Sequence, residues 1–193
     1  MNIEASEDRR VRKTKKALRE SLAELLAKKN IQNISIRELT DKADVHRSTF
    51  YANFVDIYDL YSHVEDTVIN ELREIFMSVH DLDSTQCIGL LFQYISTNKQ
   101  TSRLVLGNTV STTFLHRVSA LFKDLCIAHW CASYSLNVSN DKLNVYAHFL
   151  FSGYLGVIGE WILSDFTSSE VELMEIISEI DKNIEQLIKK SFA

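Results

Sequence analysis

Proline is absent from this 193-residue chain, and glycine occurs only 5 times. Proline breaks helices and glycine weakens them, so a chain this poor in both favours long helices over a loop-rich or all-β fold. Cysteine is also scarce, and the 3 cysteines lack paired spacing, which fits a reducing cytoplasm. Cys126, His129 and Cys131 lie close together on a predicted helix, but no second ligand cluster accompanies them. We therefore expect no metal site and no cofactor.

Long apolar runs and catalytic motifs are missing as well. No stretch reaches about 18 uncharged apolar residues, so we expect no transmembrane span. The charged N-terminus has no apolar signal core, which argues against secretion and predicts a cytoplasmic protein. No phosphate loop, paired carboxylates or nucleophile-and-base spacing stands out, so the sequence does not predict an enzyme.

Charge is unevenly distributed along the chain. The net charge is −5, but residues 1–60 hold 12 basic and 10 acidic side chains, whereas residues 61–193 hold 9 and 16. The first part is thus +2 and the second −7. Residues 9–19 contain seven basic side chains and no acidic one. A local basic patch decides whether a protein binds a polyanion more than its total charge does.

Apolar residues recur every three or four positions along most of the chain, which predicts helices. We expect Asn30 to end the first helix in a left-handed conformation. Asp56 is a candidate N-cap for a long helix that connects two parts of the molecule. The helices are expected over 9–29, 36–43, 46–54, 57–79, 85–97, 101–106, 109–133, 141–164 and 170–190.

The stretch 35–60 carries the clearest local signal. Ser35 and Glu38 have the spacing of a capping box, so a helix should begin near Ile36. Asp44 and Val45 form a turn, and a short second helix follows, whose outward side chains are polar. A short polar helix held by a preceding one suits the major groove of DNA. We interpret the stretch as a helix-turn-helix.

The helix predicted over 141–164 is apolar on every side. A helix of this kind is buried all round, which in a chain of this size suggests cover by a second subunit. The glycines in it favour close approach of another helix, either in a dimer or within the chain. Candidate dimer-interface residues are Gly153, Gly156, Trp161, Ile177, Ile180 and Ile184. We predict an all-α fold with a three-helix helix-turn-helix domain over 1–55 and a dimerising helical bundle over 56–193.

Residues 9–60 resemble the TetR family of bacterial transcriptional regulators. The resemblance rests on the basic first helix, on Ser-Ile-Arg-Glu-Leu from Ser35 and on Ala-Asp-Val-His-Arg-Ser-Thr-Phe-Tyr-Ala-Asn-Phe from Ala43. A weaker match around 153–161 is similar to a subgroup that includes dihydroxyacetone-operon regulators. Departures from the family pattern are Asn30, Asp44, His46, Asn53 and Ile57. Asp44 replaces a glycine, which predicts a turn without a positive φ.

The resemblance implies a homodimer that binds a double-stranded DNA operator and responds to a small molecule in the C-terminal bundle. Base edges would be read mainly by Arg47 and Asn53. Phosphates would be contacted by Ser35, Arg37, Lys42 and Tyr51 and by part of the basic first helix. The DNA-binding candidates are Lys13, Lys16, Ser35, Arg37, Lys42, His46, Arg47, Ser48, Thr49, Tyr51 and Asn53. The effector-pocket candidates are Tyr94, Phe114, His116, Trp130, His148, Phe151 and Tyr154, which could equally form a packed core.

The predicted function is therefore a sequence-specific DNA-binding regulator of the TetR type, acting as a repressor under effector control. Two alternatives stay open. A protein partner could replace the small molecule as the controlling ligand. Alternatively, the chain could be an all-α enzyme or ligand carrier whose helix-turn-helix no longer binds DNA.

Overall fold

The computed structural model describes residues 9–78, 83–107, 111–135 and 141–192. Within these ranges the chain forms nine α-helices and one short 3₁₀ helix and contains no strand, so the predicted all-α class is confirmed. The helices are α1 (Arg9–Leu26), α2 (Ile36–Ala43), α3 (Arg47–Tyr51), α4 (Ile57–Met77), α5 (Ser84–Thr97), α6 (Lys99–Leu106), α7 (Thr112–Tyr134), α8 (Asp141–Leu163) and α9 (Glu170–Phe192), with the 3₁₀ helix η1 at Ile31–Asn33.

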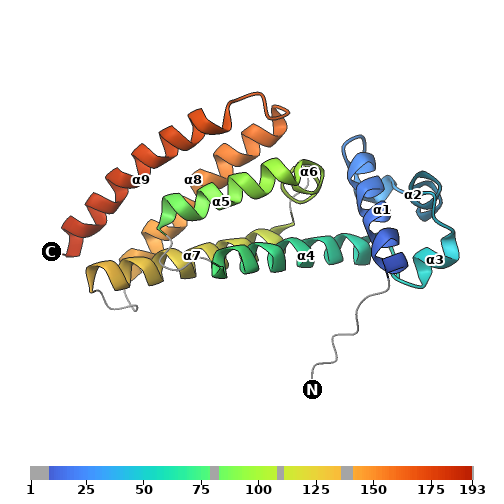
Figure 1. Ribbon diagram of the computed structural model, residues 1–193, viewed down its shortest axis with the longest axis horizontal. Helices are drawn as coiled ribbons and strands as arrows, with labels where there is room; N and C mark the ends of the chain where they lie inside the picture. The colour runs from blue at the N-terminus through green and yellow to red at the C-terminus, as the bar shows by residue number, and fades with distance from the viewer. Residues whose placement is uncertain (1–8, 79–82, 108–110, 136–140, 193) are drawn as a thin grey trace, which may run out of the picture.

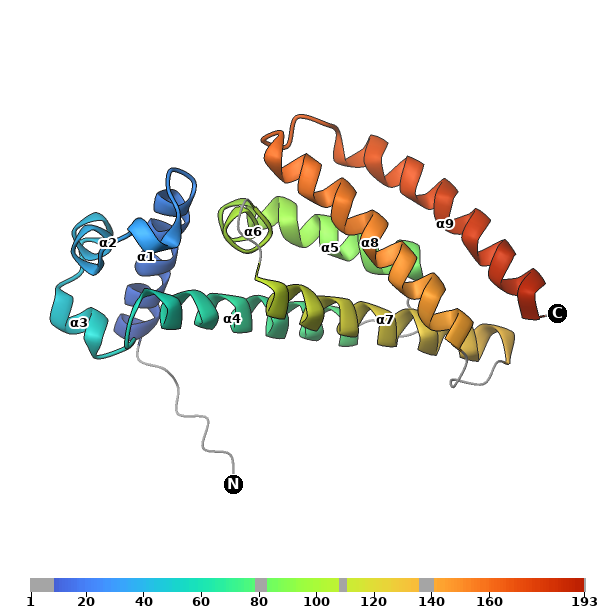
Figure 2. The same ribbon diagram turned by 180° about the vertical axis from the view of Figure 1, so that it is seen from behind.

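The molecule is elongated, and α1, α2 and α3 gather at one end of it (Figure 1). We call these three helices the reader and α4–α9 the body. Helix α4 leaves the reader and runs along the body, and the C-terminus lies at the end of the body farthest from the reader (Figure 2). Helix α1 also packs against α6, so the two parts touch at a second place. The interpreted boundary after residue 55 falls in the turn between α3 and α4.

The reader is held together by a small apolar core. Leu18 and Leu22 of α1, Leu39 of α2 and Phe50 of α3 have no exposed surface. The Phe50 ring lies 5.8 Å from that of Phe54, which caps this core on the side of α4. Each short helix therefore contributes one or two fully buried side chains, and the rest of its surface is available to solvent.

Side-chain caps set the starts of α2 and α4 where the sequence predicted them. The Ser35 hydroxyl accepts a hydrogen bond from the Glu38 amide at 3.2 Å. The Asp56 carboxylate accepts one from the Asp59 amide at 2.8 Å. Such caps satisfy amides that the helix itself leaves unpaired. In a full capping box the Glu38 carboxylate would accept a hydrogen bond from the Ser35 amide. Here that carboxylate binds Lys29 instead.

Several helix boundaries differ from the prediction, among them α3, which ends at Tyr51 and not at Phe54. Helix α1 ends at Leu26, and Asn30 is extended with φ −65°, so the prediction of a left-handed Asn30 was wrong. Residues 98–100 were expected to form a loop, but α6 begins at Lys99. It ends at Gly107, where an added Cβ would collide with the Arg103 carbonyl oxygen. The predicted turn over 136–140 and the end of the long helix at Val79 lie outside the described residues.

The turn between α2 and α3 does contain a positive φ, at Asp44. Its φ of 53° and ψ of 45° are left-handed, which corrects the expectation drawn from the missing glycine. The Val45 amide binds the Thr40 carbonyl at 3.0 Å, which satisfies an end of α2 in the manner of a Schellman motif. Aspartate is one of the few non-glycine residues that adopt this conformation readily.

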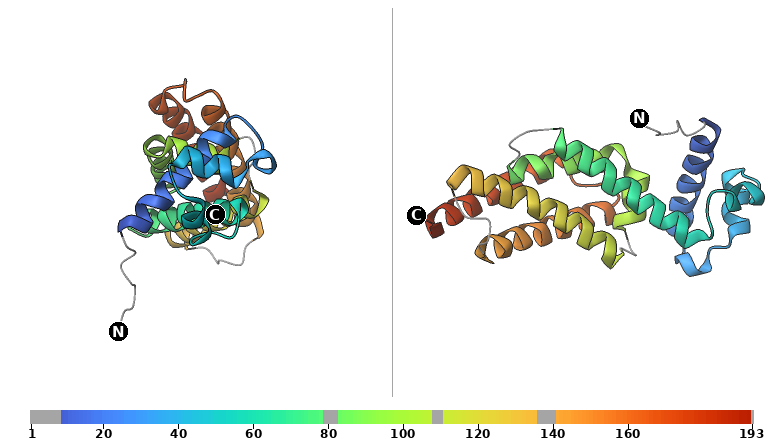
Figure 3. Two further views of the ribbon diagram at one scale, coloured as in Figure 1. Left: turned by 90° about the vertical axis from the view of Figure 1, so that its right-hand side faces the viewer. Right: turned by 90° about the horizontal axis from the view of Figure 1, so that it is seen from below.

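The body packs four long helices and two shorter ones around an aromatic core. Trp130 is completely buried, and the rings of Phe92 and Trp161 lie 4.9 Å apart. Helices α8 and α9 run antiparallel, since Tyr146 binds Ser191 and Tyr154 binds Asp181. Figure 3 shows this long bundle from its end and from below, with the reader at one end.

Within the single chain helix α8 is buried on one side only, and cover of its other side by a second subunit stays a prediction. Val145 and Phe149 are each 67% exposed and Leu163 is 57% exposed. Helix α9 exposes Ile176, Ile180 and Leu187 in the same way. The apolar stripes of α8 and α9 therefore lie partly on the surface of the single chain. In the described ranges, none of the helices has the length and apolar character needed to span a membrane.

Candidate nucleic-acid interface

Helix α3 presents a compact set of polar side chains at the tip of the reader. It has only five residues, and Phe50 anchors it in the core. Because Phe50 points inward, the neighbouring side chains of Arg47, Ser48 and Tyr51 are exposed. Tyr51 is 59% exposed, and its ring meets Phe50 edge-on at 5.6 Å. The arrangement offers a cation, a hydroxyl and a phenol on one short helix.

His46 caps α3 in place of the serine or threonine that the family pattern favours. Its Nδ1 accepts a hydrogen bond from the Ser48 amide at 3.3 Å and lies 2.7 Å from the Ser48 hydroxyl. The departure noted in the sequence is thus chemically compatible with a helix start. It also means that this exposed imidazole holds the first turn of α3.

Thr49 and Asn53 are placed differently from the exposed side chains of α3. Both are half-buried, and the Asn53 amide nitrogen donates to the Thr49 carbonyl oxygen at 2.8 Å. The Asn53 side chain thereby closes the C-terminal end of α3. Its remaining hydrogen-bonding capacity is the amide oxygen and one amide proton.

The candidate residues of α2 are exposed but engaged within the reader. Ser35 caps the helix, and Arg37 lies 3.6 Å from Asp41. Lys42 binds Glu24 of α1 at 2.6 Å. A hydrogen bond from Lys42, followed by its charge, lowers the pKa of the Glu24 carboxyl. Lys42 therefore joins α2 to α1, in addition to any role toward a ligand.

Basic side chains of α1 line a cleft between α1 and the first half of α4. Lys13 and Lys16, both predicted from sequence, belong to it and are exposed. The contribution of α4 was not predicted, because the periodicity of α4 indicated only its buried stripe. We call this site the α1–α4 cleft. Its lining residues are Arg9, Arg12, Lys13, Lys15, Lys16, Arg19, Leu60, His63, Val64, Thr67 and Glu71.

The body contains a small apolar cavity between α4, α5, α6, α7 and α8. Its volume is about 30 Å³, which is about the share of one molecule in liquid water. Four of the seven effector-pocket candidates line it, namely Tyr94, Phe114, Phe151 and Tyr154. Sixteen residues line the cavity in all, and twelve of them, mostly aliphatic, were not singled out from sequence because they read as ordinary core positions.

Polar groups in the lining are few. The Tyr94 hydroxyl donates to Glu71 at 2.6 Å, and the Tyr154 hydroxyl donates to Asp181. Burial raises the pKa of both tyrosines above the usual value of 10, and the neighbouring carboxylates add to the rise. Ser102 is 1% exposed, and its hydroxyl has no hydrogen-bond partner among the described residues.

The other three effector-pocket candidates lie away from this cavity. His116 of α7 and His148 of α8 are exposed on the outer sides of their helices. Trp130 is fully buried, but it packs in the core and is not part of the lining. The sequence predicted both helices, with the second apolar on every side, but it could not tell which side of α7 and α8 faces the cavity.

The six dimer-interface candidates divide into two groups. Trp161, Ile177 and Ile184 are between 3% and 9% exposed, so they belong to the core of the single chain and are unavailable to a partner. Gly153, Gly156 and Ile180 are exposed. A Cβ added at either glycine would meet no described atom within 4 Å, so no helix of the described chain approaches them.

Known proteins share both the sequence pattern of the body and the overall architecture. A family model described as the C-terminal region of TetR-type transcriptional regulators matches residues 82–183. No curated protein sequence matches the chain.

Several solved structures share the fold. The dihydroxyacetone kinase operon activator DhaS is 18% identical, with a TM-score of 0.63, covering 93% of this chain and 97% of that one. A TetR transcriptional regulator from Streptococcus agalactiae is 19% identical, with a TM-score of 0.61 and coverage of 94% and 96%. NalD, the secondary repressor of the MexAB-OprM multidrug efflux pump in Pseudomonas aeruginosa, is 16% identical, with a TM-score of 0.67 and coverage of 89% and 96%.

At these identities the solved structures establish a likeness of fold. The family model adds a match over just over half of the chain, in the part where the sequence resemblance was weakest. The N-terminal motifs and the C-terminal match agree, and the resemblance predicted from residues 9–60 is confirmed. The chain belongs to the TetR family of transcriptional regulators.

Proposed function

We propose that this regulator is a homodimeric, sequence-specific DNA-binding repressor whose affinity for its operator is controlled by a small molecule in the body. The observation that carries the proposal is the exposed face of α3, held by His46 and Phe50 beside a strongly basic α1. A major groove accepts a helix of this kind, and phosphates attract the basic helix.

The exposed side chains suggest a division of roles. Arg47 is suited to guanine, because its guanidinium makes two parallel hydrogen bonds to the O6 and N7 atoms. Ser48, Thr49, Tyr51 and Asn53 supply hydrogen bonds around it. Ser35, Arg37 and Lys42 of α2, with Lys13 and Lys16 of α1, are suited to phosphates, which position a protein without specifying sequence.

The exposed apolar stripes of α8 and α9 support dimerisation. Val145 and Phe149 on α8 and Ile180 on α9 form uncovered apolar surface, and Gly153 and Gly156 leave the α8 backbone bare between such side chains. The α8 and α9 helices of a second subunit would cover this surface, and the dimer would then bring two readers to one DNA duplex. Two readers on one face of DNA contact half-sites about one helical turn apart.

The apolar cavity supports effector control. It is nearly filled in this conformation, so a ligand would have to open it, and opening would separate α4 from its neighbours. The Ser102 hydroxyl has no hydrogen-bond partner among the described residues, and an unsatisfied buried polar group costs about 1–3 kcal/mol. A ligand that carries one hydrogen-bonding group would therefore bind more tightly there. The proposed effector is therefore a mainly apolar small molecule with one polar group at that position.

The hydrogen bond between Tyr94 and Glu71 offers a route from the cavity to the reader. Tyr94 lines the cavity, whereas Glu71 belongs to α4 and lines the α1–α4 cleft. A ligand that displaces the Tyr94 ring would break this bond and would release Glu71 toward the basic side chains of α1. We propose α4 as the coupling element, since it is continuous between the two sites.

Selection of genomic DNA on the purified protein tests the DNA role. We expect enrichment of one short sequence family, and measurement at two salt concentrations should give a steep loss of affinity. Lys13→Gln and Lys16→Gln should each reduce the slope of log affinity against log salt by up to about 0.9. Recovery of no preferred sequence would contradict the proposal and would favour an all-α ligand carrier.

A reporter gene placed behind the selected operator tests the direction of control. Repression predicts lower expression when the regulator is present and recovery when a cavity-binding compound, found by thermal-shift screening, is added. Higher expression with the regulator would identify an activator instead. Recovery that requires a co-purifying protein and no compound would transfer control to a protein partner.

A further inference from the structure

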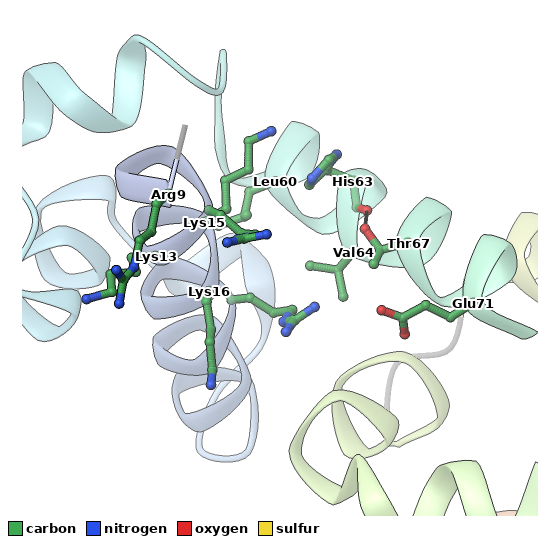
Figure 4. A pocket seen from close by; sticks show the side chains of 11 residues that line it. Arg9, Lys13, Lys15, Lys16, Leu60, His63, Val64, Thr67 and Glu71 are labelled. Carbon is green, nitrogen blue, oxygen red and sulfur yellow. Dashed lines mark hydrogen bonds between the residues drawn. The ribbon is translucent and has the colours of Figure 1, made fainter. Parts of the chain in front are cut away.

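The α1–α4 cleft has a volume of about 480 Å³ and gathers an unusual density of positive charge. Six cationic residues of α1 line it, and Glu71 of α4 extends its carboxylate toward α1 (Figure 4). Glu71 already accepts a hydrogen bond from Tyr94 at 2.6 Å. Clefts lined by charge of one sign focus the electrostatic field and concentrate counter-ions.

Several cations of the cleft differ from the basic side chains that join distant parts of the chain. Lys29, Lys42, Arg103 and Arg117 each pair with a carboxylate from a different part of the chain. In contrast, Arg9, Arg12 and Lys13 have no ion pair among the described residues, and Lys16 reaches only Glu20 on its own helix at 3.8 Å. The buried Nε of Arg19 also has no described hydrogen-bond partner. Arg9, Arg12, Lys13 and Lys16 thus give the cleft several cations whose charge is little neutralised by the described residues.

The cleft extends away from the exposed face of α3. Its α4 side runs from Leu60 to Glu71, which spans about 16 Å at the helical rise of 1.5 Å per residue. The deeper part, with Arg19, Thr67 and Glu71, lies where the reader meets the body. An anion held there would touch α1 and α4 at the same time, whereas DNA lying across α3 would approach the outer cations first.

We propose that the α1–α4 cleft binds a small polyphosphorylated anion, independently of DNA, and that this anion joins the reader to α4. Several phosphate groups match several closely spaced donors, because guanidinium and ammonium groups bind phosphate oxygens through charge-assisted hydrogen bonds. Single carboxylates would leave most of the donors unpaired. The cleft would therefore serve as a second regulatory site, separate from the apolar cavity.

Titration calorimetry of the full chain without DNA, with inorganic tripolyphosphate as the probe, tests this site. We expect saturable binding of one tripolyphosphate per chain. Lys16→Gln and Arg12→Gln should each weaken it about tenfold, since a hydrogen bond to a charged group contributes about one such factor or more. Lys28→Gln removes the same charge from an exposed position beyond α1 and outside the cleft, and should change the affinity less than twofold.

Two results would overturn the proposal. Absence of saturable tripolyphosphate binding would leave the cleft as a contact for the DNA backbone only, even if Lys16→Gln weakens DNA binding. If Lys28→Gln weakens tripolyphosphate binding as much as the cleft variants do, the binding reflects general attraction by net charge and not a site in the cleft. Circular dichroism of each variant checks that its helix content is unchanged, and Lys16, whose side chain is 66% exposed, is the substitution least able to disturb folding.

Discussion

The reader and the body are both made of amphipathic helices, but they leave different kinds of side chain on their surfaces. The reader exposes polar and charged groups around α3, with Tyr51 and Val55 as single apolar exceptions. The body exposes continuous apolar stripes, represented by Phe149 on α8 and Ile180 on α9. Scattered apolar side chains are normal on a surface, whereas contiguous ones mark a contact site. The two ends therefore offer surfaces of different chemistry, one polar and charged and one apolar.

The charges point the same way. Residues 1–60 carry a net charge of +2 and residues 61–193 a net charge of −7. A polyanion is attracted to the first part and repelled by the second, so DNA should approach the molecule from the reader end. The total charge of −5 hides this difference, which explains why net charge alone is a poor guide to nucleic-acid binding.

The strongest test of whether the two parts are separable is removal of a core ring from the reader. Phe50→Ala should cost about 3–5 kcal/mol, because a fully buried aromatic side chain is replaced by a cavity. We expect loss of DNA binding with retention of the dimer, measured by fluorescence anisotropy and analytical ultracentrifugation. Phe92→Ala is the matched substitution in the body. Dissociation of the dimer by Phe50→Ala would show that the two parts are one cooperative unit.

A charge on the body stripe should break the proposed dimer while sparing the reader. Ile180→Glu places a carboxylate on α9 at a side chain that is 48% exposed in the single chain. Loss of a central interface contact costs about 2 kcal/mol or more, so dissociation should become at least about 30-fold easier. Sedimentation velocity over a concentration series measures the dissociation constant of the dimer. Lys182→Glu, an exposed site on the same helix, serves as the control, and a wild-type chain that sediments as a monomer would refute the dimer.

Truncation of Arg47, the exposed cation on α3, should weaken operator recognition without affecting folding. Arg47→Ala should reduce affinity for the selected operator by about 1–3 kcal/mol, or roughly 5- to 150-fold, and should relax the preference at one base pair. Arg117→Ala in the body removes the same side chain far from α3, where Arg117 pairs with Asp66. Gel-shift titrations on matched and mismatched operators would show equal losses for both variants if Arg47 acts only through charge.

The smallest expected effect concerns a buried carboxyl in the body. Burial raises the pKa of Asp181 above its ordinary 3.8, although hydrogen bonds from Tyr154 and Thr85 oppose the rise. The folded state then binds this proton more tightly than the unfolded state, so unfolding free energy should fall as pH rises from about 4 toward the raised pKa. Asp181→Asn should flatten that fall in urea titrations at several pH values.

Asp181→Asn should not abolish the pH dependence, because burial also raises the pKa of Glu65 and Glu185. Asp124→Asn, at an exposed site on α7, is the control. An identical stability profile for Asp181→Asn and the wild type would show that the Asp181 carboxyl is not perturbed by its surroundings.

The parts of the fold that local chemistry determines were predictable. Ser35 and Asp56 begin helices because their side chains bind amides three residues on, and that pattern is visible in sequence. Helix ends were harder. Asp44 has a positive φ although the residue is not glycine, and Asn30 has a negative one although asparagine tolerates the opposite. Both depend on what the next helix packs against, and a local pattern does not contain that information.

The candidate sites followed the same division. The face of α3 was predictable, because a five-residue helix with one buried ring has a single exposed side. The cavity was not, since Tyr94 and Tyr154 meet only after helices distant in sequence have packed together. Trp161 was expected at a dimer interface because it lies in a helix that is apolar on every side, but it packs against Phe92 inside the chain. Size and hydrophobicity identify a contact-forming residue and leave open which contact it forms.

Hydroxyl-radical footprinting of the wild-type protein on its selected DNA tests the central claim most directly. If two readers are held by one dimerised body, the footprint will show two protected half-sites about 10–10.5 base pairs apart from centre to centre, on one face of the duplex. Arg47→Ala will weaken both half-sites equally. A single protected site that persists at the concentrations where the protein is a dimer, or uniform protection without half-sites, would contradict the account.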